Sequence, residues 1–200
     1  MKGCAKSHCP SVIGITGGIG SGKSVVSQLL GVMGYSVFDS DKEAKLLMNQ
    51  DEELKQSLCD AFGSQTYHNG LLNRDFLASV IFSEKQALHR INALVHPAVG
   101  NWFKRWAASQ KGNLVFFECA ILFESGFETL ADQIWTVSAP LEVRIERAIA
   151  RDHSTREKIV ERIKSQMSQE EKELRSDSII YNDDVLPLIP QVERLLDKLQ

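Results

Sequence analysis

The chain has 200 residues, and its 23 lysines and arginines against 26 aspartates and glutamates give a formal net charge of −3. With 43% hydrophobic and 24% charged residues, the composition is typical of a folded globular domain and excludes the disordered, collagen-like and disulfide-scaffold classes. The near-neutral charge argues against a broad nucleic-acid surface, and no apolar run reaches the ~18 residues that a membrane span needs. We therefore expect neither nucleic acid nor a membrane as partner.

The first ten residues, 1–10, contain no apolar stretch of the kind found in signal peptides, so we interpret them as a short tail. Cys4, His8 and Cys9 lie in this tail, but no second Cys/His pair follows at zinc-site spacing, which disfavours a metal site. Four scattered cysteines in a chain of this length are typical of a reducing compartment. We expect a cytoplasmic protein.

Residues 11–16 form a short β-branched apolar run, which predicts a strand. A glycine cluster follows, and apolar side chains then recur at helical spacing from Lys23 to Met33, before Gly34 ends the pattern. The first elements are therefore predicted to be a strand, a loop and a helix.

Tyr35–Phe38 predicts a second buried strand, and Ser40–Glu43 fits a capping box that starts a helix. Helical periodicity then prevails to about Lys111, and we interpret residues 41–111 as a helical insertion. The pattern breaks at Gly63, at Asn69-Gly70, and at His96-Pro97, where the proline is expected to open a new helix.

Leu114–Phe117 and Gln133–Ala139 are apolar runs of strand length. The span 142–177 then carries nine acidic and nine basic side chains, so we expect it to bury little surface. Within it, a second capping box at Ser154–Glu157 predicts a helical hairpin with its turn near Asp152-His153.

Ser178–Tyr181 predicts a last strand, and Pro187–Leu199 predicts a closing amphipathic helix. Strands separated by helices predict an α/β fold of the P-loop NTPase type, with a doubly wound parallel sheet of about five strands. Ligands of such sheets bind at the carboxyl ends of the strands.

Residues 17–24, Gly-Gly-Ile-Gly-Ser-Gly-Lys-Ser, fit the pattern G-x-x-x-x-G-K-[ST] between a predicted strand and a predicted helix. The glycines let backbone N–H groups point at phosphate oxygens, and the helix N-terminus adds positive potential. Lys23 then supplies charge to the β- and γ-phosphates, and the Ser24 hydroxyl is a Mg²⁺ ligand. The predicted nucleotide-binding residues are Gly17, Gly18, Gly20, Ser21, Gly22, Lys23, Ser24 and Val25, the last through its amide.

The loop alone does not say what becomes of the γ-phosphate. A GTP-binding switch protein would carry an Asn-Lys-x-Asp motif after a later strand, and this sequence has none. A small-molecule kinase needs an acceptor site, a base and closing arginines. Asp39 and Asp41, just beyond the second strand, are candidates, although Asp41 would equally stabilise the N-terminus of the following helix.

Arg144, Arg147 and Arg151 recur at three- and four-residue spacing, so one helix face can present several guanidinium groups to phosphate. The alternative is a solvated surface on which nearby glutamates pair with them. Glu118 ends the third strand, either as a carboxylate close to the metal or as an ordinary strand-end acid.

Taken together, these residues resemble the dephospho-CoA kinase family from about Val12 to Asn182. The likeness rests on Ile15–Ser24, Asp39-Ser40-Asp41, Leu72–Arg74, His96-Pro97, Leu122–Glu124, Arg147 with Arg151-Asp152, and Asp177–Asn182. It implies phosphorylation of the ribose 3′-hydroxyl of dephospho-coenzyme A by ATP with Mg²⁺, which is the last step of coenzyme A biosynthesis. It also implies a nucleotide-binding core of residues 11–40, 112–141 and 176–200, an acceptor-binding insertion of residues 41–111, and a lid of residues 142–175.

By the same resemblance, Asp41 is similar to the family's general base and Arg147 to its lid arginine. Nucleotide contacts are implied for Arg151 and for Asn182, near the adenine, and acceptor contacts for Asp39, Arg74, His96, Leu122 and Glu124. Three positions depart from the family pattern: Val25 replaces a Thr, Asn73 replaces an Asp, and Cys119-Ala120-Ile121 lacks a Pro.

Two alternatives remain open. A nucleoside or nucleoside-monophosphate kinase shares the loop, the strand-end acid and the arginines, and a nucleotide-gated binding protein would hydrolyse nucleotide slowly without an acceptor. We expect a monomer or a small homo-oligomer.

Overall fold

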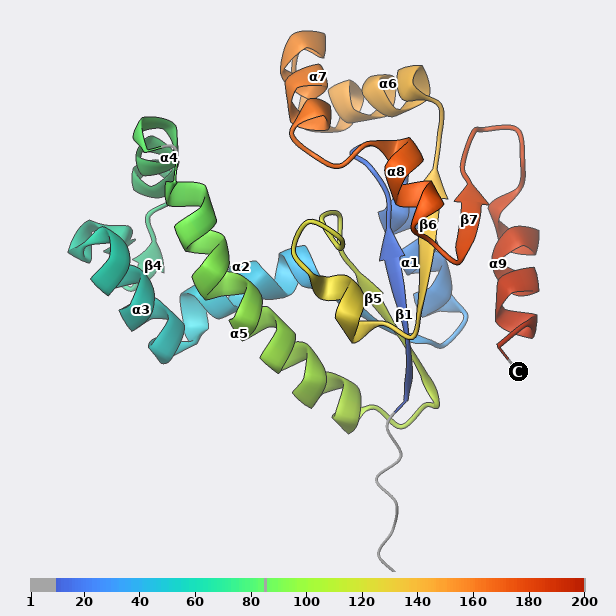
Figure 1. The fold of residues 1–200 in the computed structure, drawn as a ribbon, viewed down its shortest axis with the longest axis horizontal. Helices are drawn as coiled ribbons and strands as arrows, with labels where there is room; N and C mark the ends of the chain where they lie inside the picture. Colours follow the sequence, from blue (N-terminus) through green and yellow to red (C-terminus); the bar gives the residue numbers. More distant parts are fainter. Residues whose placement is uncertain (1–9, 85, 200) are drawn as a thin grey trace, which may run out of the picture. The chain divides into compact units, whose positions relative to one another are not determined.

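The computed structural model describes residues 10–84 and 86–199 (Figure 1). The predicted tail with Cys4, His8 and Cys9 lies outside these residues, except for Pro10. The chain divides into two compact units, one made by the residues up to Asp39 together with those from Ala107 onward, the other by Ser40–Trp106. None of the helices described combines the length and the apolar character that crossing a bilayer requires.

The first unit is built on a parallel sheet with the strand order β2-β5-β1-β6-β7. Its strands are β1 (Ser11–Thr16), β2 (Ser36–Asp39), β5 (Leu114–Glu118), β6 (Gln133–Ser138) and β7 (Ser178–Tyr181). The predicted five-stranded parallel sheet is therefore confirmed, with strand ends within one residue of those expected. Because all the strands run the same way, their carboxyl ends gather at one edge, with β1 in the middle.

Helices cover both faces of this sheet. Those packed against the strands are α1 (Lys23–Val32), α8 (Gln169–Leu174) and α9 (Leu188–Asp197), with a short 3₁₀ turn η2 (Phe127–Leu130). Two further helices, α6 (Leu141–Asp152) and α7 (Arg156–Lys164), form a small core of their own beyond the carboxyl ends of the strands (Figure 1). Trp135 and Val137 of β6 join the core formed with α1 and α9. Thr136, between them, points to the other face, where its hydroxyl bonds to the Lys172 carbonyl of α8. Burial on both faces explains why the strands appear in the sequence as unbroken apolar runs.

The second unit is mainly helical, with α2 (Ser40–Gln50), α3 (Glu52–Phe62), α4 (Arg74–Ser83) and most of α5 (Ala87–Ser109), together with the 3₁₀ turn η1 (Ser64–Thr66). It also contains a small antiparallel hairpin of β3 (Tyr67–His68) and β4 (Leu71–Leu72), which the helical periodicity did not predict. Asn69 and Gly70 form its turn with φ of 51° and 79°. Two positive φ values are what a tight Asn-Gly hairpin turn requires.

Pro97 does not start a helix as expected, because it lies inside the 23-residue α5. Ile91, Val95, Val99 and Phe103 are buried at four-residue spacing on one continuous face that runs past the proline. An interior proline costs about 3 kcal/mol, whereas each buried large apolar side chain contributes about 1.5–3 kcal/mol. Burial along this face therefore outweighs the lost hydrogen bond.

The predicted capping box at Ser40 does not form either. Ser40 is the first residue of α2, and its buried hydroxyl has no hydrogen-bond partner among the described residues. The carboxylate of Glu43, the other half of the box, accepts a bond of 2.7 Å from the Trp102 indole N–H. The glutamate is thus engaged by α5 and not by the start of its own helix.

The predicted helical hairpin in the charged span is confirmed as α6 and α7. The turn contains His153 in the left-handed conformation, with φ of 48°. Thr155, one residue later than expected, caps α7 by accepting from the Lys158 amide at 3.5 Å.

Candidate active site

The glycine-rich loop, residues 17–22, connects β1 to α1 at the carboxyl edge of the sheet (Figure 1). Gly22 is the N-cap of α1 and makes no side-chain cap, and a helix cannot bond its own first amides, so these are suited to phosphate. Lys23 Nζ donates to the Gly17 carbonyl at 2.9 Å, which folds the ammonium back onto the loop. The Val25 amide, expected at the α-phosphate, here donates to the Gly22 carbonyl at 3.0 Å.

Side chains from later in the chain hold the loop backbone in place. Gln169 Oε1 accepts from the Gly18 amide at 3.0 Å, Gln166 Oε1 accepts from the Ile19 amide at 3.2 Å, and Asn182 Nδ2 donates to the Ser21 carbonyl at 2.8 Å. Three of the predicted nucleotide-binding residues, Gly18, Ser21 and Asn182, therefore make contacts within the protein. The loop has an outer side that is bonded to its own chain and an inner side formed by the start of α1.

Arg144 lies against this outer side. Its side chain is almost completely buried, at 4% exposure, and its Nε donates to the Ile19 carbonyl at 3.0 Å. A Cβ added at Gly18 would collide with the guanidinium, and one at Gly20 would collide with the backbone of Arg144. Burial lowers the pKa of the Arg144 guanidinium, and two nearby glutamates partly offset this effect. The glycines are thus needed for the approach of α6 as well as for the approach of phosphate.

The other two arginines of the predicted face have different surroundings. Arg147 pairs with Asp184 at 2.6 Å and donates to the Asn182 carbonyl at 2.9 Å, next to the loop. Arg151 is exposed and pairs with Asp152 at 2.7 Å. The hydrogen bonds from this arginine and from a second one, Arg162, lower the pKa of the Asp152 carboxyl. The three arginines of the predicted face therefore have different partners within the chain.

Two carboxylates end neighbouring strands at the same edge of the sheet. Asp39 of β2 and Glu118 of β5 are register partners, and Glu118 is also in register with Ile15 of β1, just before the loop. Oxygen donors of this kind, with the exposed Ser24 hydroxyl in the first turn of α1, fit the ligand preference of Mg²⁺. Asp41 is exposed as the second residue of α2.

Glu124, expected to contact the acceptor, is engaged by the protein. Lys172 Nζ donates to both of its carboxylate oxygens, at 2.8 and 2.9 Å, and the Met167 amide donates at 2.9 Å. Burial alone would raise the pKa of the Glu124 carboxyl, but these hydrogen bonds and the lysine charge bring it below its usual value. Lys172 also donates to the Ala120 carbonyl at 2.9 Å, so the segment that lacks the family's proline is held by this completely buried ammonium.

The remaining predicted acceptor residues divide between burial and exposure. Leu122 is completely buried, and its Cδ1 occupies the space that a side chain at Gly14 would need. Arg74 is exposed as the first residue of α4, whose N-cap is Asn73, accepting from the Phe76 amide at 3.1 Å. His96 is partly buried in α5, and burial lowers the pKa of its imidazole. Arg74 and His96 both belong to the second unit.

Sequence reasoning missed Gln166, Gln169 and Lys172, which support the loop and the segment after β5. All three lie in the charged span that we expected to bury little surface, yet Gln169 and Lys172 are buried. The one available signal was that glutamines interrupt an otherwise charged pattern, and this does not identify a partner.

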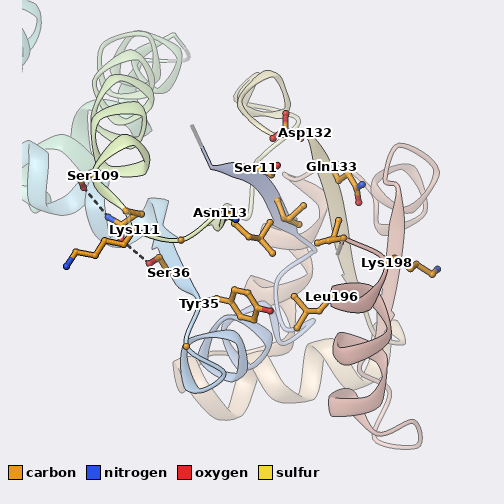
Figure 2. Close-up of a pocket in the computed structure, with 16 residues that line it drawn as sticks. Ser11, Tyr35, Ser36, Ser109, Lys111, Asn113, Asp132, Gln133, Leu196 and Lys198 are labelled. Carbon is orange, nitrogen blue, oxygen red and sulfur yellow. Dashed lines mark hydrogen bonds between the residues drawn. The ribbon is translucent and has the colours of Figure 1, made fainter. Parts of the chain in front are cut away.

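A cavity of about 1290 Å³ lies at the opposite edge of the sheet (Figure 2). Ser11, Leu114 and Gln133, which line it, are the first residues of β1, β5 and β6. Ligands of parallel sheets bind at the carboxyl ends of the strands, and this cavity is at the amino ends. We therefore place the chemistry at the loop and not in this cavity.

Comparison with known proteins gives the family of this chain. The family model for dephospho-CoA kinase matches residues 11–187. The dephospho-CoA kinase of Bacteroides fragilis is 45% identical over 185 residues, which cover 92% of this chain and 90% of that protein. The crystal structure of TT1252 from Thermus thermophilus superposes with a TM-score of 0.81 at 37% identity, covering 96% of this chain and 98% of that one.

A more distant structure shows how general the fold is. Shikimate kinase from Aquifex aeolicus has a TM-score of 0.51 at 19% identity, covering 94% of this chain and 95% of that one. This likeness shows only the P-loop kinase fold. The family match over residues 11–187 and the 45% identity are more specific. This chain belongs to the dephospho-CoA kinase family.

Proposed function

We propose that this chain transfers the γ-phosphoryl group of ATP to the ribose 3′-hydroxyl of dephospho-coenzyme A, giving coenzyme A and ADP. The observation that carries the proposal is the phosphate-binding loop at the carboxyl end of the central strand, within a family match that spans both the core and the helical insertion. In the reaction, the 3′-oxygen bonds to the γ-phosphorus, the bond to the β,γ-bridging oxygen breaks, and the hydroxyl proton passes to a carboxylate.

Lys23 and the first amides of α1 would hold the triphosphate. The support for this role is positional, because the lysine sits at the helix N-terminus and its ammonium already contacts the loop. The amides of Gly20, Gly22 and Ser24 would complete this inner side. Ser24 would hold Mg²⁺, with Glu118 at the end of the neighbouring strand β5, and the ion when bound would neutralise charge on the β- and γ-phosphates. We propose Asp39, the register partner of Glu118, as an acceptor contact.

Asp41 would accept the proton of the 3′-hydroxyl. The chain passes from β2 to α2 without a linker, so the Cα atoms of Asp39 and Asp41 are at most about 7.6 Å apart. The aspartate thus directly follows the strand end beside which we propose that the nucleotide binds. A carboxylate held within reach of a reacting hydroxyl contributes typically 10²- to 10⁴-fold to the rate.

Arg147 would stabilise charge on the transferring phosphoryl group. Its contact with Asn182, whose amide bonds to the loop, supports this role, and its ion pair with Asp184 would have to open. We propose Arg151 as a second nucleotide contact, and residues 142–175 as a lid.

Arg74 and His96 would contact the acceptor from the insertion. A partly buried imidazole with a lowered pKa is neutral at pH 7 and can both donate and accept a hydrogen bond. For Leu122 and Glu124 we propose a supporting role, because one is completely buried and the other is bonded to Lys172.

The acceptor assignment is tested by measuring ADP release with ATP, Mg²⁺ and one acceptor at a time. We expect kcat/KM for dephospho-coenzyme A to exceed that for AMP, CMP, shikimate and gluconate by at least about 10³-fold, because a site built to bond polar groups rejects analogues that lack them. Equal or better turnover of a competitor would overturn the acceptor assignment. Slow ADP release that no acceptor stimulates would favour a nucleotide-gated binding protein.

A further inference from the structure

Ile19 is the one apolar residue in the loop sequence between Gly17 and Lys23. Its side chain packs against a small core formed by both helices of the α6–α7 hairpin. The buried members of this core are Ile145, Ala148 and Ile159, with Ile149, Val160 and Ile163 packed around them. An apolar side chain adds nothing to phosphate binding, so this residue serves a contact on the outer side of the loop.

The backbone of Ile19 is bonded to the same region. Its amide donates to Gln166 Oε1 at 3.2 Å, just after α7, and its carbonyl accepts from Arg144 Nε at 3.0 Å, on α6. Side chain, amide and carbonyl of one loop residue are therefore all engaged by residues 144–166. A substitution of the side chain leaves both backbone bonds chemically possible, which makes the apolar contact separately testable.

The residues on either side of Ile19 permit this contact. A Cβ at Gly18 or at Gly20 would collide with Arg144, so two glycines are needed for α6 to approach the loop. Arg147 lies one helical turn after Arg144 on the same helix, and it bonds to the Asn182 carbonyl. The contacts of Ile19 with α6 therefore hold the part of the helix that carries Arg147.

We propose that Ile19 is a positioning residue that couples the shape of the phosphate-binding loop to the position of the α6–α7 hairpin. The proposal rests on the nucleotide-binding part of the proposed function and is independent of the acceptor. When the side chain is shortened, the loop is no longer held in one shape before ATP binds, so ATP binding has to order it. The position of α6, and with it that of Arg147, also becomes less fixed. Both the affinity for ATP and the rate of transfer then fall.

The test measures the Kd of a fluorescent ATP analogue, and kcat where an acceptor is turned over, for Ile19→Ala and Ile19→Val. We expect Ile19→Ala to weaken binding about tenfold and Ile19→Val, which keeps most of the contact, by less than about threefold. Val192→Ala is the matched control, because it truncates a completely buried side chain of α9 in the main core. It should lower thermal stability while the analogue's Kd stays within about twofold of the wild-type value.

A double-mutant cycle with Ile159→Ala separates coupling from general destabilisation. If the two side chains act through their shared core, Ile19→Ala in the Ile159→Ala background should weaken analogue binding by less than about threefold. Additive effects on Kd, or an Ile19→Ala chain that is folded by circular dichroism and binds like wild type, would overturn the proposal. If Ile19→Ala does not fold, the cycle is run with Ile19→Val and Ile163→Ala. An effect of Ile19→Val on the analogue's Kd that is as large in the Ile163→Ala background as in the wild type would then overturn the proposal.

These outcomes distinguish the two proposals. A wild-type chain that binds the analogue but does not phosphorylate dephospho-coenzyme A would contradict the acceptor assignment and leave the coupling result standing. A wild-type chain that does not bind ATP would contradict both.

Discussion

The inner and the outer side of the phosphate-binding loop are built on different principles. The inner side consists of Lys23 and the N-terminus of α1, where the residue types and their spacing are enough to indicate phosphate binding. The outer side consists of Gln166, Gln169 and Arg144, whose roles come only from what they touch. The difference teaches that residues which bind a ligand can be recognised from a sequence motif. Residues that hold those residues in place can be recognised only from their contacts in the structure.

The largest effect is expected on the inner side, for Lys23→Met. Removing the ammonium takes away charge that meets the transferring phosphoryl group, so kcat/KM for acceptor-dependent ADP release should fall about 10³-fold. The free energy of unfolding should stay within about 1 kcal/mol of wild type, because the lysine is only partly buried. A loss of kcat/KM of less than tenfold would contradict the distinction between the two sides, since the inner side would then contribute little to phosphoryl transfer.

The second largest effect is expected for the strand-end acids. Asp41→Asn should lower kcat by about 10²- to 10⁴-fold, the range of a general base, while the Kd of an ATP analogue stays within about threefold. Asp39→Asn is the matched control and should cost less turnover. The opposite order would move the role of base to Asp39.

For the Lys172–Glu124 pair, which supports the segment after β5, the expected effect is one of stability. Lys172→Met removes the ammonium that binds both oxygens of Glu124, whose side chain is only 24% exposed. An unpaired carboxylate left at such a site should destabilise the fold by about 3 kcal/mol, measured by urea unfolding. Adding Glu124→Gln should recover part of this loss, and a single-variant loss below about 1 kcal/mol would show that the pair does not support the site.

The sheet and its five strands could be predicted because buried parallel strands leave unbroken apolar runs, as at Val115–Phe117. The loop could be predicted because binding a phosphate group requires glycines, a lysine and a hydroxyl at fixed spacing. The β3–β4 hairpin was missed although Asn69-Gly70 is a strong turn signal, because only two residues on each side form the ladder.

Other features could not be predicted because they depend on partners distant in the chain. The burial of Lys172 requires Glu124, 48 residues earlier, and nothing in the local charge pattern distinguishes it from its exposed neighbours. The continuity of α5 through Pro97 likewise depends on burial that a local helix rule does not include.

The smallest effect is a pH dependence of stability at the Lys172–Glu124 pair. The pKa of Glu124 lies below its usual value in the folded chain, so the unfolded chain binds the proton more readily. The stability from this carboxylate is therefore present above pH 4.5, its usual pKa, and is lost as the pH falls through the lower folded value. The difference in unfolding free energy between wild type and Glu124→Gln should be smaller at pH 3.5 than at pH 7. A difference that grows on acidification would contradict the assigned ion pair.

The proposed reaction is tested most directly by the position of the new phosphate. Proton–phosphorus correlation spectra of the product formed from dephospho-coenzyme A and ATP should show the added phosphorus coupled to the ribose 3′-proton, and Lys23→Met should give no such product in the same time. Coupling to the 2′-proton, or a phosphate on any other part of the acceptor, would contradict the proposed transfer.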